Sequence, residues 1–368
     1  MIHNEMRKHG IKLVLGYTVE GFKEKDNGVE VLLKDNPSLQ ADMVVLAIGV
    51  TPDTVLAKEA GLELGIKESI VVNDRMETSV PDIYAAGDAV QVKHYVTGND
   101  ALISLAGPAN KQGRIIADNI CGGDSRYLGS QGSSVIKVFD MTAATTGINE
   151  TNAKKSGLEV DTVILSPMSH AGYYPGGKVM TMKVIFEKES YRLLGAQIIG
   201  YEGVDKRIDV LATAIHAGLN ATQLKDLDLA YAPPYSSAKD PVNMAGFMID
   251  NIAKGTLKQW HLEDMDKISK DKDVVLLDVR TVGEFSMGHI DGFKNIPVDE
   301  LRERNSEIEK GKPVYLICQS GLRSYIASRI LEGNGYETYN FSGGFRFYDA
   351  VVNDRALIER AYACGMDY

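Results

Sequence analysis

Apolar and polar positions alternate differently in three stretches of the chain. In the first stretch, residues 2–9 are polar with helical spacing, and apolar alternation on both sides of Asp26-Asn27-Gly28 predicts a β-hairpin. The continuously apolar run that opens residues 41–54 predicts a strand buried in a parallel sheet. Short strands are expected within residues 65–90, and residues 108–123 have the spacing of a helix that ends at a Gly-Gly pair.

The second and third stretches have patterns of their own. Residues 133–148 and 176–200 alternate as half-buried strands do, whereas residues 203–218 are amphipathic with helical spacing. This combination predicts an α+β unit built on an antiparallel sheet. From Val274 onward, strand patterns and helical patterns follow one another in turn, which predicts an α/β unit with a parallel sheet.

Composition narrows the class of protein. A length of 368 residues predicts more than one domain, and a formal net charge of −10 argues against a general nucleic-acid-binding protein, which needs a basic face. No stretch approaches the roughly 18 apolar residues that a membrane-spanning helix requires, and the charged N-terminus has no apolar signal core. Three cysteines cannot build a disulfide framework, so we expect a cytoplasmic protein whose thiols are free for chemistry.

Cys318 stands where the apolar run of residues 314–317 ends and a small polar loop leads into a helix. Backbone N–H groups at a helix N-terminus favour negative charge, so this position favours a reactive thiolate. Gly321 lets the backbone come close to the sulfur, and Arg323 supplies a cation for an anionic substrate. The alternative is a buried core cysteine, which is common for this residue type.

Three spaced motifs around Cys318 resemble the rhodanese family, at residues 276–298, 318–324 (CQSGLRS) and 341–345 (FSGGF). The resemblance implies that Cys318 attacks a sulfane sulfur, from thiosulfate or another donor, and holds it as a persulfide that loop amides stabilise. Between Cys318 and Arg323, the loop contains Gln319, Ser320, Gly321 and Leu322, and Ser324 follows it. A six-residue loop is typical of the sulfur-transferring members. The longer loops of phosphatase-like relatives count against phosphate or arsenate chemistry.

Charged residues of the first rhodanese-like motif are expected to be structural. Asp278 and Arg280 are spaced to form an ion pair within the domain that holds the loop. Glu284 and His289 likewise show no separate chemical signal. The predicted chemistry therefore depends on Cys318 and its loop.

Residues 78–90 resemble the second flavin signature of the pyridine nucleotide-disulfide oxidoreductases, and residues 46–54 resemble the joint between that family's nucleotide-binding domains. The resemblance implies that Asp88, after Gly87, bonds the ribityl chain of FAD. It also implies a helix that passes the isoalloxazine with Ala106, Pro108 and Ala109. The family's Gly-x-Gly-x-x-Gly phosphate loops and its redox cysteine have no counterpart in this sequence. We therefore expect this chain to be the C-terminal part of a longer enzyme, and we expect that it does not retain FAD by itself.

Two tyrosine clusters, at residues 170–177 and 229–241, precede the rhodanese-like end. This combination resembles the coenzyme A-disulfide reductase–rhodanese fusions and the related NADH-dependent persulfide and polysulfide reductases. The resemblance implies a homodimer in which Tyr173 and Tyr231 reach toward the partner's cysteine and the substrate sulfur, since a phenol can donate a hydrogen bond to a leaving thiolate. Packing at an interface explains these tyrosines equally well, with Tyr174 and Tyr235 as their neighbours. For the phosphates of coenzyme A, the candidate contacts are Lys206 and Arg207, which a solvated helix face also explains.

The expected fold is a multidomain α/β and α+β protein with partial nucleotide-binding (Rossmann-like) domains. We expect the C-terminal parts of an NAD(P)H-binding and an FAD-binding domain, a dimerisation domain, a linker with a first helix, and an α/β rhodanese domain. Their expected ranges, in that order, are residues 1–66, 67–125, 126–250, 251–272 and 273–363. Residues 1–125 should be poorly stable in isolation, because the missing halves would cover their edges, whereas residues 260–363 should fold independently.

The expected parent enzyme is an FAD-dependent reductase that uses NAD(P)H to reduce coenzyme A disulfides, persulfides or polysulfides, fused to a rhodanese. For this chain, the expected residual activity is sulfur transfer through a Cys318 persulfide. The alternative is a non-catalytic scaffold for dimerisation or sulfur carriage.

Overall fold

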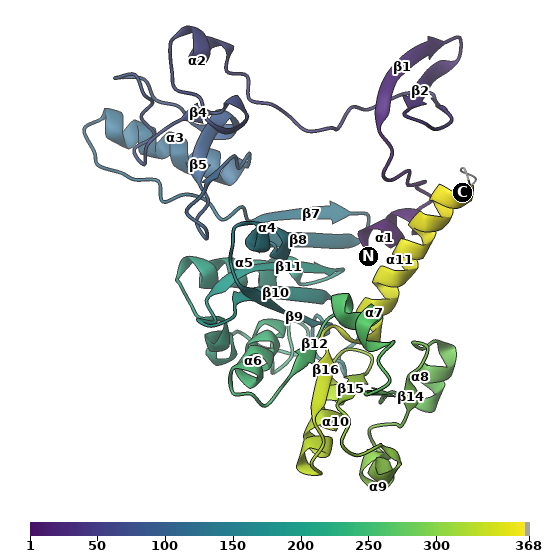
Figure 1. Ribbon diagram of the computed structural model, residues 1–368. Helices are drawn as coiled ribbons and strands as arrows, with labels where there is room; N and C mark the ends of the chain where they lie inside the picture. The colour runs from purple at the N-terminus through teal and green to yellow at the C-terminus, as the bar shows by residue number, and fades with distance from the viewer. Residues whose placement is uncertain (365–368) are drawn as a thin grey trace. The chain divides into compact units, whose positions relative to one another are not determined.

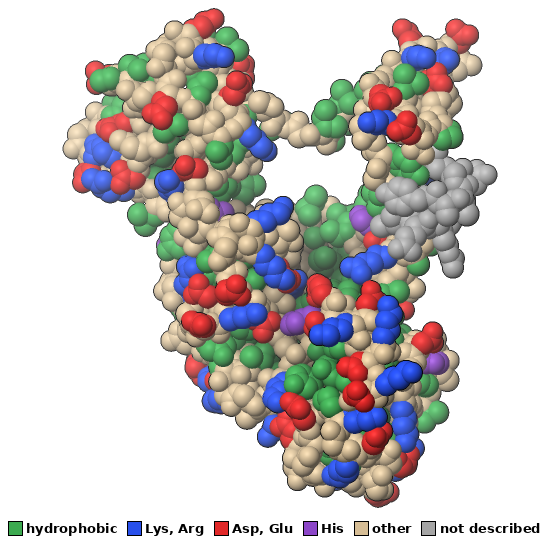
Figure 2. Space-filling view, viewed as in Figure 1, with side chains coloured by type: hydrophobic (Ala, Val, Ile, Leu, Met, Phe, Trp, Pro, Cys, Tyr) green, Lys and Arg blue, Asp and Glu red, His purple; other side chains and the backbone are tan. Residues whose placement is uncertain are grey.

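The computed structural model describes residues 1–364, which divide into two units. Figure 1 labels the helices and strands, and Figure 2 shows the side chains in the same view. Residues 1–5 and 133–353 make the first unit, and residues 6–132 with the chain from Asp354 make the second. Two helices contain residues of both units, namely α1 (Ile2–Lys8) and α11 (Gly344–Cys364). No helix of the described residues is long and apolar enough to cross a membrane.

One half of the first unit is a five-stranded antiparallel sheet in the order β7-β8-β11-β10-β9. The strands are β7 (Ser134–Val138), β8 (Met141–Gly147), β9 (Val160–Leu165), β10 (Thr181–Glu187) and β11 (Leu193–Gly200). The helices are α4 (Glu150–Lys155), α5 (Val204–His216), the 3-10 helix η3 (Ala221–Asp226) and α6 (Pro241–Ala253). Helix α5 packs on β8 and β11 through the amphipathic face that its sequence predicts. The α+β prediction is confirmed.

The other half of the first unit is a five-stranded parallel sheet in the order β12-β16-β15-β13-β14. The strands are β12 (Gln259–Trp260), β13 (Val275–Asp278), β14 (Lys294–Asn295), β15 (Val314–Ile317) and β16 (Thr338–Phe341). The helices are η4 (Leu262–Asp264), α7 (Met265–Ile268), α8 (Val282–Met287), α9 (Leu301–Arg304), η5 (Asn305–Glu307) and α10 (Leu322–Gly333). The segment expected as a linker thus supplies edge strand β12, because Trp260 is a core residue packed on Phe341.

The second unit holds two small sheets. In the first, β1 (Val19–Lys25), β2 (Gly28–Leu33) and β3 (Leu39–Ala41) run antiparallel, and Lys25 pairs with Gly28 across the predicted hairpin turn. The second contains β4 (Ile70–Val71), β5 (Val90–Lys93) and β6 (Asp100–Ala101). The helices are α2 (Val55–Glu59), η1 (Ile66–Glu68), η2 (Gly87–Ala89) and α3 (Ala106–Ile120).

The apolar run of residues 41–54 predicts a buried strand, and this prediction is wrong. Beyond Ala41, this segment is irregular, and the side chains of Met43, Leu46 and Ile48 are 76%, 64% and 90% exposed. A strand buried in a parallel sheet needs a hydrogen-bonded neighbour on each side. Within residues 1–364 no strand pairs with this segment, so its apolar side chains have nothing to pack against.

Candidate active site

Cys318 lies directly after the central strand β15 and has no exposed surface. The Gly321 N–H donates a hydrogen bond to its Sγ at 3.1 Å, and the Ser324 hydroxyl donates to the same sulfur at 3.2 Å. Gly321 adopts φ +100°, a conformation that lets the loop turn into α10 with its N–H aimed at the sulfur. The predicted loop therefore places two donors where they stabilise negative charge on sulfur.

The late Gly-Gly motif supports this loop from the other side. The Phe345 N–H donates to the Cys318 carbonyl at 2.8 Å, and the Arg346 N–H donates to the Gln319 carbonyl at 3.2 Å. Gly344 has φ +66°, and a Cβ there would lie 2.6 Å from the backbone nitrogen of Ser320. Only glycine fits at this contact, which explains the motif FSGGF in physical terms.

Arg323 does not stand free beside the sulfur. Its guanidinium donates two hydrogen bonds of 2.7 Å to the carboxylate of Glu284, which also accepts bonds from the backbone and hydroxyl of Thr281 at the start of α8. The Arg323 hydrogen bonds lower the pKa of Glu284 to about 2. The cation predicted for an anionic substrate is thus held in an ion pair between α8 and α10.

Asp278 and Arg280 form the ion pair that the sequence predicted. Both side chains are buried, and Arg280 donates to the Asp278 carboxylate at distances of 2.7 to 3.1 Å. Arg280 also donates to the Gly288 carbonyl and stacks over the ring of Phe345, 3.9 Å from its centre. This pair joins β13, α8 and the Gly-Gly turn beneath the loop.

The flavin-signature residues meet along one seam of the second unit. Gly87 and Asp88 lie in η2, whose Gly87 faces Ala109 of α3, with Ala106 and Pro108 in the same first turn of α3. The Gly87 N–H donates to the buried side chain of Gln112 at 2.7 Å, a contact that sequence reasoning missed because a lone glutamine carries no signal. The Asp88 carboxylate is exposed, and no side chain caps the N-terminus of α3.

Tyr173 and Tyr231 come together within one chain. Their hydroxyl oxygens are 2.7 Å apart, and this hydrogen bond raises the pKa of Tyr231. All four tyrosines are exposed, from 43% for Tyr174 to 75% for Tyr173, and Tyr174 also packs edge-on against His170. The two tyrosine clusters are thus adjacent in space although they are far apart in sequence.

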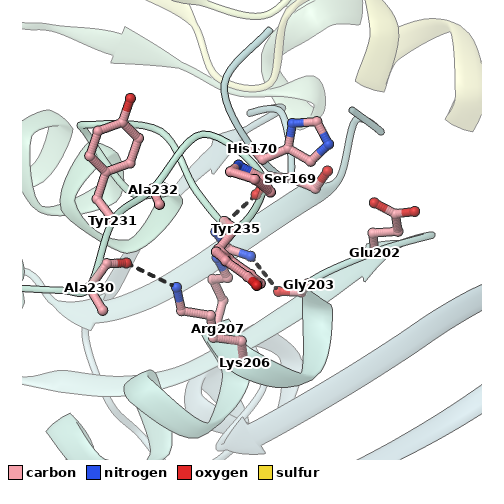
Figure 3. A pocket seen from close by; sticks show the side chains of 11 residues that line it. Ser169, His170, Glu202, Gly203, Lys206, Arg207, Ala230, Tyr231, Ala232 and Tyr235 are labelled. Atoms are coloured by element: carbon pink, nitrogen blue, oxygen red, sulfur yellow. Dashed lines mark hydrogen bonds between the residues drawn. The ribbon is translucent and has the colours of Figure 1, made fainter. Parts of the chain in front are cut away.

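A cavity of about 520 Å³ opens beside Tyr231 and Tyr235 (Figure 3). Lys206 reaches its edge, where its ammonium donates to the Ala230 carbonyl at 3.4 Å. Arg207, the other candidate for a phosphate contact, is buried and donates hydrogen bonds to five groups. Its partners are the Asp240 carboxylate, the Ser236 hydroxyl and the carbonyls of Ser169, Gly203 and Tyr235. Arg207 therefore links Ser169, directly before the first tyrosine cluster, to the second cluster, and its charge is compensated by Asp240 rather than offered to a phosphate.

Comparisons with protein families match three consecutive regions of the chain. Residues 1–113 match the pyridine nucleotide-disulphide oxidoreductase family, residues 133–241 match the dimerisation domain of that family, and residues 261–350 match the rhodanese-like domain. The crystal structure of reduced Bacillus anthracis CoADR-RHD is 46% identical in sequence, with a TM-score of 0.93 over 96% of this chain. The chain belongs to this family of flavoprotein disulfide oxidoreductases with a C-terminal rhodanese domain.

Two further relatives of this family illustrate its range. A structure of an NAD-dependent persulfide reductase from A. fulgidus is 40% identical, with a TM-score of 0.86 over 94% of this chain. The NAD(P)H sulfur oxidoreductase (CoA-dependent) of Pyrococcus abyssi is 36% identical over 242 residues, or 66% of this chain. The present chain covers 63% of each of the two solved chains and 54% of the Pyrococcus abyssi protein.

Proposed function

We propose that this chain transfers sulfane sulfur through a persulfide on Cys318. The observation that carries the proposal is the pair of donors on Sγ, from the Gly321 amide and the Ser324 hydroxyl. In the proposed step, the Cys318 thiolate attacks the outer sulfur of a donor, and the donor's sulfur–sulfur bond breaks. The leaving group departs with the electron pair, as a thiolate from an organic persulfide or as sulfite from thiosulfate. The remaining loop residues, Gln319, Ser320, Leu322 and Arg323, complete the turn from β15 into α10 that carries these donors.

We propose further that the whole enzyme, of which this chain carries the matched regions, reduces coenzyme A disulfides, persulfides or polysulfides with NAD(P)H. FAD supplies hydride acceptance and electron transfer when it is bound. Asp88 and the open N-terminus of α3 fit the polar side of a flavin, since one is an exposed carboxylate and the other offers free amides. Residues 1–368 contain no Gly-x-Gly-x-x-Gly loop for its pyrophosphate, so this chain alone should not retain FAD.

The tyrosine pair belongs to the reductase half of the proposal. In a homodimer, the hydroxyls of Tyr173 and Tyr231 would donate a hydrogen bond to the thiolate that leaves at the partner's site. The 2.7 Å bond between them supports this assignment, because one phenol can orient and polarise the other. A packing role in the interface is the alternative.

Mass spectrometry of Cys318 tests the sulfur-transfer proposal. The full chain is incubated with thiosulfate or an organic persulfide, and the mass of the protein is followed with time. We expect Cys318 to gain one sulfur atom and to release it to cyanide, and Cys318→Ala to abolish both. Cys121→Ser is the matched control, since Cys121 is an exposed thiol outside the loop and its loss should change neither. A folded wild-type chain that takes up no sulfur from any donor would favour the scaffold alternative, and the visible spectrum of the same sample checks for FAD.

A further inference from the structure

The ion pair between Arg323 and Glu284 has a consequence for the donor that the Cys318 loop accepts. A guanidinium whose two parallel donors hold one carboxylate has its charge compensated, so it attracts a second anion less strongly. Both side chains are about 30% exposed, so the pair lies at the surface next to the loop and not beneath it. The cation of the loop is therefore compensated within the protein itself.

The two helices that hold this pair, α8 and α10, also carry exposed apolar side chains. Val282 precedes Glu284 on α8, Leu322 precedes Arg323 on α10, and Ile326 follows within one turn; their side chains are 63%, 66% and 42% exposed. Cys318 itself has no exposed surface, so the outer sulfur of a donor must leave bulk water to reach Sγ. The loss of water costs less for an uncharged organic chain than for a hydrated oxyanion, whose desolvation needs a free cation.

One other cation lies close to the loop. Arg346 is exposed at the start of α11, its amide is bonded to Gln319, and no ion pair of its side chain occurs within the described residues. Arg346 is thus the competing source of anion binding, and a test must separate its effect from that of Arg323.

We propose that Glu284 sets the donor specificity of Cys318. By holding Arg323, it disfavours oxyanion donors such as thiosulfate and favours persulfides whose chain next to the sulfur is uncharged. This inference rests on the proposed sulfur transfer. Glu284 acts through Arg323, so it is a positioning residue and not a catalytic one.

The test compares two donors on three proteins. Thiosulfate and the persulfide of N-acetylcysteamine are given to the full wild-type chain, to Glu284→Gln and to Glu307→Gln, and the rate of sulfur gain at Cys318 is measured. Glu284→Gln keeps an oxygen for the Thr281 amide but releases Arg323. We expect it to raise the thiosulfate rate about tenfold, as one uncovered charge at partial exposure allows, and to change the persulfide rate less than about twofold.

Glu307→Gln is the matched control variant. Glu307 also pairs with an arginine of the same domain, Arg304, and its pKa is also lowered to about 2, yet it lies in η5 away from the loop. The two variants change the net charge equally, so a long-range effect of charge would appear in both. Equal gains in thiosulfate rate for both variants would overturn the assignment to Glu284.

A double-mutant cycle identifies the cation. In Glu284→Gln/Arg323→Gln, the gain in thiosulfate rate should disappear, because the released guanidinium is gone. A gain that persists would point to Arg346 and overturn the proposal. If Glu284→Gln does not fold, Glu284→Asp serves instead. Its shorter side chain weakens the hold on Arg323 and should raise the thiosulfate rate several-fold relative to the persulfide rate, and the absence of a rise would overturn the proposal.

The two donor rates separate a failure of the role of Glu284 from a failure of sulfur transfer through Cys318. A wild-type chain that gains sulfur while Glu284→Gln leaves the ratio of the two donor rates unchanged overturns the role of Glu284 only. A folded wild-type chain that gains sulfur from neither donor overturns the sulfur-transfer proposal as well.

Discussion

The Cys318 loop and the Gly87–Asp88 seam have similar sequence signals but differ in how many partners the chain supplies around them. Each has a glycine with positive φ near the start of a helix. Around Cys318, the partners come from the same domain: Ser324, Gly344 and the ion pair of Asp278 with Arg280. Around Asp88, the carboxylate is exposed and the first turn of α3 is uncapped. The Cys318 motif thus has its partners within one domain, whereas the Gly87–Asp88 motif presents an exposed carboxylate beside an uncapped helix.

The difference extends from the motifs to the packing around them. The parallel sheet of the rhodanese-like domain has two core clusters, one of them containing Cys318 itself and the other Trp260. The cluster described around η2 and α3 has only Met76, Val90 and Val92 as buried members. Since burial of apolar area is the dominant stabilising contribution to folding, the two regions should differ widely in stability.

The largest expected effect is a difference in protease resistance between these regions. Thermolysin cuts before apolar residues, and the exposed Leu46 and Ile48 lie in an irregular segment. We expect the first cleavage within residues 42–54, with the rhodanese-like domain surviving at least about a hundredfold longer. Timed digestion followed by mass spectrometry measures both rates. An N-terminal fragment that survives as long as the rhodanese-like domain would contradict the expected difference in stability.

A smaller effect is expected at the contact between the Gly-Gly turn and the loop. Gly344→Ala should destabilise the rhodanese-like domain by about 2–4 kcal/mol, because its Cβ would meet Ser320 at 2.6 Å with φ at +66°. Gly311→Ala is the control, since Gly311 has φ +83° but nothing within 4 Å, and should cost about 1 kcal/mol. Urea unfolding followed by the fluorescence of Trp260, the single tryptophan of the chain, reports on this domain.

If Gly344→Ala and Gly311→Ala destabilise the domain by nearly the same free energy, only the backbone conformation matters at Gly344. The late glycine motif would then have no special relation to the Cys318 loop. A clear difference would show that the close approach of the two backbones stabilises the loop.

Sequence reasoning worked where the signal was local. The hairpin at Asp26-Asn27 depends on two residues and the strands beside them, and the Cys318 loop depends on a strand end, a glycine and a helix start. The ion pair of Asp278 with Arg280 is likewise only two residues apart in sequence. In each case, the chain itself brings the partners together.

The same reasoning was incomplete where a partner is distant in sequence. Arg323 looked like a free cation because its partner Glu284 is 39 residues away. Arg207 looked like a surface residue because helical spacing does not reveal the carboxylate of Asp240, which is 33 residues away. The run at residues 41–54 looked like a buried strand because an apolar pattern shows what a segment needs and not whether its neighbours are present.

The smallest expected effect concerns the acid stability of the loop. The pKa of Glu284 falls from 4.5 to about 2 on folding, so its ion pair stabilises the fold fully above pH 4.5. This contribution is lost as the pH falls toward 2, and below pH 2 the carboxyl group is protonated in both states. Because the pair is partly exposed, we expect Glu284→Gln to cost about 1 kcal/mol at neutral pH and almost nothing near pH 2. Urea unfolding at several pH values, again through Trp260, measures this convergence. Glu307 pairs with both Arg304 and Lys294, and these three side chains are more exposed than Glu284 and Arg323. Glu307→Gln should therefore show a smaller cost at neutral pH, because solvent screens exposed pairs more strongly. A cost for Glu284→Gln that does not depend on pH would show that the pair stabilises the loop through packing rather than charge.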